Sequence, residues 1–188
     1  QRSRRKVGIP TGASGLKSST ALKRRVSWDE YFMRIAETVA SRSNCLSPAK
    51  GAIIVKSLRI ISTGYNGTPR GTKNCDEGGC QRCAIVNANS QARKLSGSGY
   101  DDQTRGPAFD YCVCCHGEEN ALVQAALNGI STDGSTIYTT FYPCSFCARM
   151  IINAGAVRVV ARHHYPADLT AKLFKEAKVK LEFLTTNA

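Results

Sequence analysis

Two short motifs constrain this chain more than any other feature, an H-x-E motif and, further along, a P-C-x-x-C motif. A catalytic zinc ion takes three protein ligands and leaves its fourth tetrahedral position to water. His116, Cys144 and Cys147 supply three ligands of the right kind. Bound zinc lowers the pKa of that water to about 7. Glu118 follows closely after His116, so we expect it to carry protons beside the metal without binding it.

Both motifs stand at the start of a predicted helix. Residues 118–127 are rich in strong helix formers, and the following Asn-Gly pair is a typical helix stop. Residues 144–154 are again helical in character, and residues 135–140 between the two helices favour a strand. Helix N-termini favour thiolate and anionic ligands. The alternative is a pair of ordinary helices with incidental cysteines, but H-x-E together with P-C-x-x-C favours a metal site.

The flanking segments predict the rest of an α/β fold. Ser27 and Glu30 form a capping-box pattern before a helix that runs to about Arg42. With the elements above, the predicted order is α-β-β-α-β-α-β-α-β, a mixed five-stranded sheet sandwiched by helices. The remaining predicted elements are strands at 52–56, 59–65, 157–162 and 179–184 and a helix at 167–177.

Residues 66–115 interrupt this pattern. They contain seven Gly and few apolar runs, which predicts a long irregular insertion rich in cysteine. Such a loop normally needs a function or a cross-link to hold it.

The cysteine content and the chain length limit the class of protein. A chain of 188 residues suits one domain. Its nine Cys are odd in number and cluster near the His-Cys-Cys motif, which favours metal thiolates in an intracellular reducing compartment over a secreted disulfide scaffold. No apolar run approaches the length of a transmembrane helix, so we expect no membrane association.

The net charge of +12 is concentrated at the N-terminus. Residues 1–27 carry eight basic residues and no acidic residue, which leaves +4 for residues 28–188. We expect 1–27 to be a flexible basic arm before a single domain at 28–188. Its composition is typical of an organelle transit peptide and equally of an RNA-binding arm. The candidates for RNA contact are Arg2, Arg4, Arg5, Lys6, Lys23, Arg24 and Arg25.

Several longer runs resemble the deoxycytidylate (dCMP) deaminase family within the cytidine deaminase superfamily. The resemblance spans roughly residues 45–162. It implies a cytidine-deaminase-like three-layer α-β-α sandwich and an oligomeric zinc enzyme that hydrolyses dCMP to dUMP. The matching runs are GAIIV, RIISTGYNGTPRG, NCDEGGCQRC, HGEENAL, PCSFCARMIINAG and VRVV.

The resemblance also implies roles for single residues. Glu118 would protonate N3 of cytosine while water attacks C4, and would then help the amino group leave as ammonia. Asn66 aligns with an Asn that contacts the sugar, although an Asn-Gly pair is by itself simply a turn. Tyr142 would stack on the base, or it would only pack in the core.

A second, structural zinc is implied as well. Cys45 and Cys75 fall where relatives place two of its ligands. The other two would come from the pairs Cys80-x-x-Cys83 and Cys112-x-Cys114. The set that we predict is Cys45, Cys75, Cys83 and Cys114, which would tie the insertion to the helix after His116.

Two functions remain open on the sequence. The first is a dCMP deaminase acting on a deoxynucleotide in the cytoplasm or mitochondrion. The alternative is a deaminase-fold structural subunit of a ribonucleoprotein, such as an organellar ribosome, anchored to RNA by its basic arm. The retained catalytic groups favour the enzyme, and the arm favours the subunit. Editing of cytosines in RNA is a weaker interpretation, because no aromatic platform for stacking bases is evident.

Overall fold

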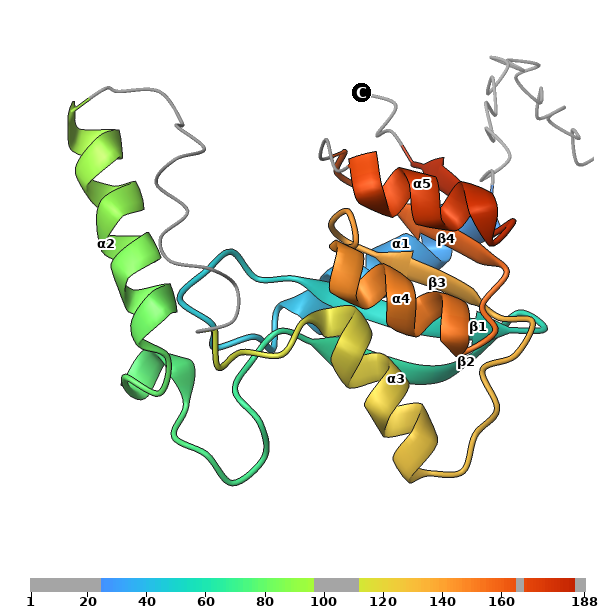
Figure 1. The fold of residues 1–188 in the computed structure, drawn as a ribbon, viewed down its shortest axis with the longest axis horizontal. Coiled ribbons are helices and arrows are strands. Elements are labelled where there is room, and N and C mark those ends of the chain that lie inside the picture. The colour runs from blue at the N-terminus through green and yellow to red at the C-terminus, as the bar shows by residue number, and fades with distance from the viewer. Residues whose placement is uncertain (1–24, 97–111, 165–167, 185–188) are drawn as a thin grey trace, which may run out of the picture.

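A five-stranded mixed sheet forms the centre of the molecule (Figure 1). The computed structural model describes residues 25–96, 112–164 and 168–184. The strand order is β2-β1-β3-β4-β5; the β2–β1 and β1–β3 pairs are antiparallel, whereas β3–β4 and β4–β5 are parallel. The strands are β1 (Gly51–Lys56), β2 (Arg59–Tyr65), β3 (Thr136–Thr139), β4 (Arg158–Ala161) and β5 (Lys180–Phe183).

One helix, α1 (Trp28–Ala40), covers one face of this sheet. Its N-cap is the predicted Ser27, whose side-chain oxygen accepts a hydrogen bond from the Glu30 backbone N–H at 3.1 Å. Its buried Phe32 and Met33 pack against strand residues, including Ile53 of β1. Successive side chains of a strand point to opposite faces of the sheet, so the residue after Ile53 faces away from α1.

Three helices cover that opposite face: α3 (Gly117–Leu127), α4 (Ser145–Asn153) and α5 (Asp168–Glu176) (Figure 1). Their apolar sides meet the other side of the sheet in a second core cluster that includes Ile54, Leu122, Ile137, Ile151 and Phe174. The predicted three-layer α-β-α sandwich with a mixed five-stranded sheet is therefore confirmed.

The prediction that residues 66–115 are irregular is wrong for most of residues 75–96. This segment contains a short 3₁₀ helix, η1 (Cys75–Glu77), and a helix, α2 (Gln81–Ser96). All seven glycines of 66–115 lie outside α2, whose residues include Gln, Arg, Ala, Lys and Leu, all good helix formers. Residues 97–111 of the insertion lie outside the described part of the chain.

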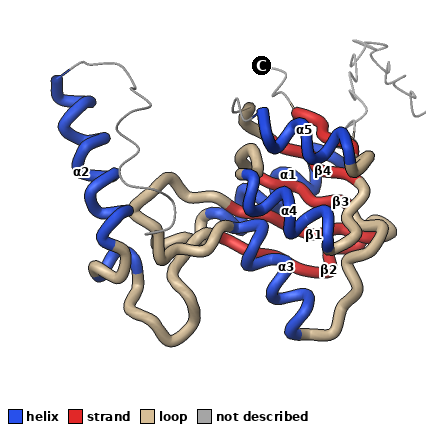
Figure 2. The backbone as a smooth tube through the Cα atoms, viewed as in Figure 1, coloured by secondary structure: helices blue, strands red, loops and turns tan. Residues whose placement is uncertain are grey.

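Helix α2 stands apart from the three-layer body (Figures 1 and 2). The body and α2 are joined by loops that run from the end of β2 and into the start of α3. A small group of buried cysteines, separate from both clusters on the sheet, packs at this junction. Among the described residues, no helix combines the length and hydrophobicity needed to cross a membrane.

Candidate active site

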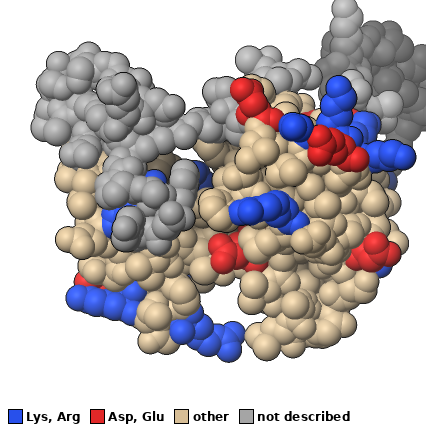
Figure 3. Space-filling model, viewed as in Figure 1, with Lys and Arg blue, Asp and Glu red and all other residues tan. Residues whose placement is uncertain are grey.

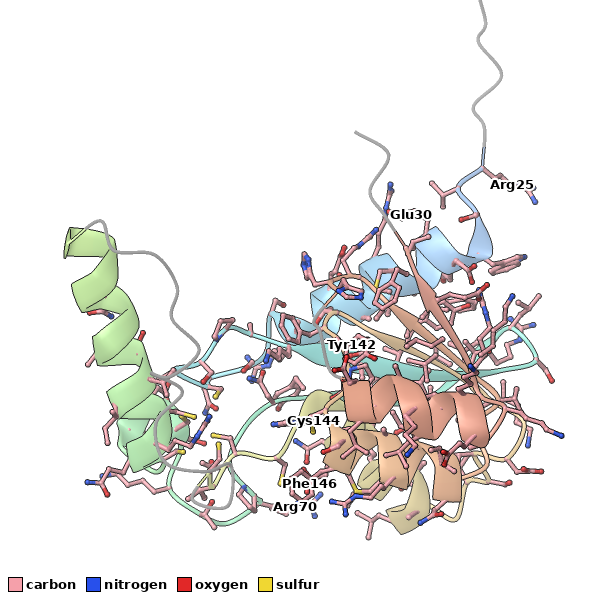
Figure 4. The ribbon with its side chains drawn as sticks, turned by 45° about the horizontal axis from the view of Figure 1, so that its top comes forward. Arg25, Glu30, Arg70, Tyr142, Cys144 and Phe146 are labelled. Atoms are coloured by element: carbon pink, nitrogen blue, oxygen red, sulfur yellow. The ribbon has the colours of Figure 1, made fainter. Side chains whose placement is uncertain are left out.

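The H-x-E and P-C-x-x-C motifs meet at the N-termini of two neighbouring helices. His116 is the N-cap of α3, Cys144 is the N-cap of α4, and Cys147 lies in the first turn of α4. The Nδ1 atom of His116 is 3.5 Å from the Sγ atom of Cys144 and 3.4 Å from that of Cys147. Tetrahedral zinc at normal bond lengths would separate such atoms by about 3.6 Å. The three side chains therefore fit a zinc ion with little movement. Figure 4 shows Cys144 where α4 begins.

The two thiols differ strongly in acidity. The pKa of Cys144 is lowered to about 4, chiefly because its sulfur accepts a hydrogen bond from the Cys147 thiol and then from His116. The backbone N–H of Cys147 also points at this sulfur, at 3.5 Å. The pKa of Cys147 is raised by the hydrogen bond that it donates to Cys144 and by burial. One thiolate is thus formed readily, and a metal must displace the proton from the second thiol.

Glu118 lies beside these three candidate ligands without joining them. It is 6% exposed, and its Oε2 atom is 3.7 Å from the Cys147 sulfur. Its Oε1 atom accepts a 2.6 Å hydrogen bond from the hydroxyl of Thr139, which is itself buried at the end of β3. The same hydroxyl lies 3.0 Å from the carbonyl oxygen of Phe141. A carboxylate held in this way has one oxygen anchored and the other directed toward the metal ligands.

Thr139 is a site residue that the sequence analysis missed. No motif marks it, since it belongs to the strand that leads into the P-C-x-x-C motif. Its signal is weak: a hydroxyl on a buried strand requires a partner, and the sequence does not say which one.

Backbone contacts fix the position of His116. Gly67 and Cys115 exchange two backbone hydrogen bonds, of 2.9 and 3.2 Å, which join the segment after β2 to the residue before His116. A Cβ atom built on Gly64 would lie 2.2 Å from the carbonyl oxygen of Gly117. Only glycine allows β2 and α3 to approach so closely. The start of α3 is therefore held by the backbone of β2.

Asn66 lies near the site, but its side chain forms hydrogen bonds with the backbone around it. Its side-chain oxygen accepts from the Lys50 N–H at 2.8 Å, and its amide donates to the Pro48 carbonyl at 3.2 Å. Asn66 is 4% exposed, and its two hydrogen bonds hold the segment that leads into β1 in place. Its predicted contact with the sugar stays a prediction.

Tyr142 is buried among aromatic side chains. Its ring stacks on that of Phe183 with a centroid distance of 5.8 Å and an interplanar angle of 8°, and it also meets His164 at 5.9 Å. Burial raises the pKa of its phenol. This position favours the packing role that the sequence left as the alternative, and base stacking stays a prediction.

The four cysteines predicted to hold a second zinc are brought together. Cys45, Cys75, Cys83 and Cys114 have their sulfur atoms within 4.8 Å of one another. Cys80 and Cys112, the other members of the two pairs, lie beside them in a second group of four, which also contains Cys83 and Cys114.

Most of the basic arm lies outside the described residues. Six of the seven candidate RNA contacts precede residue 25 and lie outside the described residues; Arg25 is described and exposed. On the face shown in Figure 3, the basic and acidic side chains of the described residues are interspersed.

Known proteins are similar to this chain in sequence and in fold. Residues 26–163 match the cytidine and deoxycytidylate deaminase zinc-binding region. A deoxycytidylate deaminase of Schizosaccharomyces pombe is 40% identical over 158 residues, which cover 84% of this chain and 44% of the relative. The chain thus spans less than half the length of that relative. A deoxycytidylate deaminase of Mycobacterium phage D29 is 38% identical over 77% of this chain and 98% of its own length.

A solved structure agrees with these relatives. The dCMP deaminase of cyanophage S-TIM5, crystallised in complex with dCMP and dUMP, superposes with a TM-score of 0.63 and 30% sequence identity. The match covers 86% of this chain and 99% of that protein. With its His-Cys-Cys site and neighbouring carboxylate, this chain belongs to the zinc-binding family of cytidine and deoxycytidylate deaminases.

Proposed function

We propose that this chain hydrolyses dCMP to dUMP with a zinc ion held by His116, Cys144 and Cys147. The observation that carries the proposal is the position of Glu118, a buried carboxylate beside the ligand set with one oxygen anchored by Thr139. When bound, zinc supplies a Lewis acid that lowers the pKa of water at the site. A carboxylate at this distance is within reach of that water and of a base bound next to it.

Glu118 performs the proton transfers of this reaction. As the water oxygen bonds to C4 of cytosine, Glu118 receives the proton that the water gives up and delivers it to N3. The C4–N4 bond then breaks, and Glu118 passes the second water proton to the amino group, which leaves as ammonia. One water and one dCMP give one dUMP and one ammonia. The Thr139 hydroxyl keeps the carboxylate in place during both transfers.

The substrate carries a phosphate, and Lys50 is the cation that we propose to face it. Lys50 lies with its ammonium group 4.1 Å from the centroid of the Phe141 ring. The pKa of His116 is raised chiefly by the hydrogen bond that it donates to the Cys144 sulfur, and the positive charge of Lys50 acts in the opposite direction. A cation here would attract a nucleotide more strongly than an uncharged nucleoside.

The relatives are named as deaminases, which supports the enzyme over the ribonucleoprotein subunit. The structure of the cyanophage protein with dCMP and dUMP supports this nucleotide as substrate. A homo-oligomer and a cytoplasmic or mitochondrial location stay predictions. Light scattering on the purified chain tests the first of these.

The test is release of dUMP and ammonia from dCMP by the purified, zinc-loaded full chain. We expect turnover that Glu118→Gln abolishes while zinc content stays the same. The matched control is Glu176→Gln, which neutralises an exposed carboxylate on α5 and should leave turnover intact. Lys50→Met should raise KM for dCMP more than for deoxycytidine.

Absence of turnover in the zinc-loaded chain would refute the proposal. If that chain instead bound RNA in a salt-sensitive way that deletion of residues 1–27 removed, the structural subunit would be the better interpretation.

A further inference from the structure

Six of the nine cysteines form one compact cluster at the junction between α2 and the three-layer body. They come from four separate segments: the loop after α1, η1, the start of α2 and the segment before α3. The cluster is distinct from both cores on the sheet. Its members are Cys45, Cys75, Cys80, Cys83, Cys112 and Cys114.

The six sulfurs divide into two overlapping groups of four. Cys83 and Cys114 belong to both groups, and their sulfurs are 3.9 Å apart. Cys45 completes the first group with Cys75, at 3.7 Å from Cys83 and 3.6 Å from Cys114. In the second group, Cys112 lies 3.8 Å from Cys83 and 4.0 Å from Cys80.

These separations fit metal thiolates. Two sulfurs bound to one tetrahedral zinc at normal bond lengths lie about 3.8 Å apart. A disulfide needs about 2.05 Å, and all six cysteines are free. Six thiols alone would be a small apolar core, a weak anchor for a helix as long as α2.

The hydrogen bonds around the cluster provide a second, independent observation. The Cys83 sulfur accepts a hydrogen bond from the Ser47 hydroxyl at 3.6 Å. N–H and O–H groups aimed at sulfur stabilise a thiolate and orient it for a metal.

The same pattern holds for the fully buried Cys75, whose sulfur accepts from the Leu46 N–H at 3.4 Å. A single zinc on the first group would leave Cys80 and Cys112 as spare thiols, yet the Cys112 sulfur lies 3.8 Å from that of Cys83 and 4.0 Å from that of Cys80. The hydrogen bond to Cys83 and burial raise the pKa of Cys112 to about 12, and the positive charge of Arg82 opposes this rise.

We propose that the cluster is a binuclear zinc-thiolate site in which Cys83 and Cys114 each bridge both ions. Cys45 and Cys75 complete the coordination of one ion, and Cys80 and Cys112 complete that of the other. Each ion then has four sulfur ligands, the closed arrangement of a structural zinc site. Six thiolates outweigh two divalent cations by two charges, which the N–H groups and Arg82 help to balance. The site would fold α2 onto the body.

The test is the zinc content of the full chain, purified under reducing conditions and measured by elemental mass spectrometry. We expect about three ions per chain, one at the catalytic site and two in the cluster. Cys80→Ser and Cys112→Ser should each reduce the count by about one while the chain stays folded by circular dichroism. Cys115→Ser is the matched control, because Cys115 belongs to neither group and the count should not change.

His116→Ala separates the two sites, because it should remove the catalytic ion and leave the cluster loaded. A second measurement is independent of the count. After exchange with ¹¹³Cd, the two cluster ions should give two resonances with a mutual coupling transmitted through the bridging sulfurs, and Cys80→Ser should abolish that coupling.

About two zinc ions per chain, unchanged by Cys80→Ser, would overturn the proposal in favour of one four-cysteine site. Iron in place of zinc, or two cadmium resonances without mutual coupling, would also overturn it. None of these readouts depends on deaminase activity, so they fail or succeed separately from the proposed function.

Discussion

The hydroxyl of Thr139 should control how well Glu118 transfers protons. It donates to a buried carboxylate at 2.6 Å and can turn to the Phe141 carbonyl at 3.0 Å when that carboxylate carries a proton. The same group thus supports both protonation states of Glu118. Thr139→Val keeps the shape of the side chain and removes only this donor and acceptor.

The expected fall in kcat follows from the strength of the hydrogen bond between Thr139 and Glu118. A hydrogen bond to a charged group contributes about 1.5–3 kcal/mol. At about 1.4 kcal/mol for each factor of ten, kcat for dCMP should fall by about 10- to 100-fold. KM should change little, because Thr139 supports the carboxylate and is not placed to touch the substrate. Thr139→Ser should restore most of the rate, since it returns the hydroxyl.

Steady-state kinetics with dCMP, together with zinc content and a urea melt for each variant, provides the assay. Thr140→Val is the matched control: it removes the neighbouring hydroxyl, which accepts from the Gly51 N–H at 3.0 Å and does not contact Glu118. It should reduce stability without a comparable loss of kcat. A folded, zinc-loaded Thr139→Val with kcat within about twofold of wild type would refute the reasoning.

Three further predictions concern stability. Arg158 donates to both carboxylate oxygens of Asp29 at 2.8 Å, so Arg158→Lys should lower the free energy of unfolding by about 1–3 kcal/mol in urea melts. The hydrogen bond from Arg158 lowers the pKa of Asp29 below its unfolded value. This stabilisation is therefore present at neutral pH and lost as pH falls through the lowered pKa, below about 4. In urea melts between pH 7 and 2, the free energy of unfolding of Arg158→Lys should fall less with pH than that of the wild type. Gly64→Ala puts a methyl group 2.2 Å from a backbone oxygen of α3 and should cost about 1–3 kcal/mol or more, whereas Gly67→Ala meets its nearest atom at 3.5 Å and should cost less than about 1 kcal/mol. Asn66→Ala removes two hydrogen bonds to the segment before β1 and should cost about 1–3 kcal/mol by the same measurement, with an added rise in KM for dCMP if Asn66 also contacts the sugar.

The parts of the fold and site that the sequence predicts well are those encoded over a few neighbouring residues. The cap at Ser27, the helix stop after residue 127 and the helix formers behind each motif are local signals, and they gave elements close to those observed. His116 and Cys144 each begin a helix, so predicting those helices also placed two of the proposed zinc ligands.

Two kinds of feature could not be predicted from the sequence. Some were hidden by the average composition of a long segment, and others depend on tertiary contacts. Helix α2 was hidden because the glycines on both sides of it dominated the composition of residues 66–115. Thr139 was hidden because its partner, Glu118, reaches it only when β3 and α3 are packed. The sharing of Cys83 between two groups of sulfurs requires four segments to meet, and no spacing in the sequence encodes that meeting.

The close spacing of Cys114 and His116 has a thermodynamic consequence. One residue separates the cysteine cluster from the catalytic ligand, and the backbone of that residue is paired with Gly67. Occupation of either site restricts the same short segment, so it reduces the ordering cost of filling the other. The two sites should therefore bind metal cooperatively and with equal reciprocal effect, by about 1–3 kcal/mol if the coupling is of ordinary size. A chelator should then remove the metals over a narrower range of concentration than it would from two independent sites.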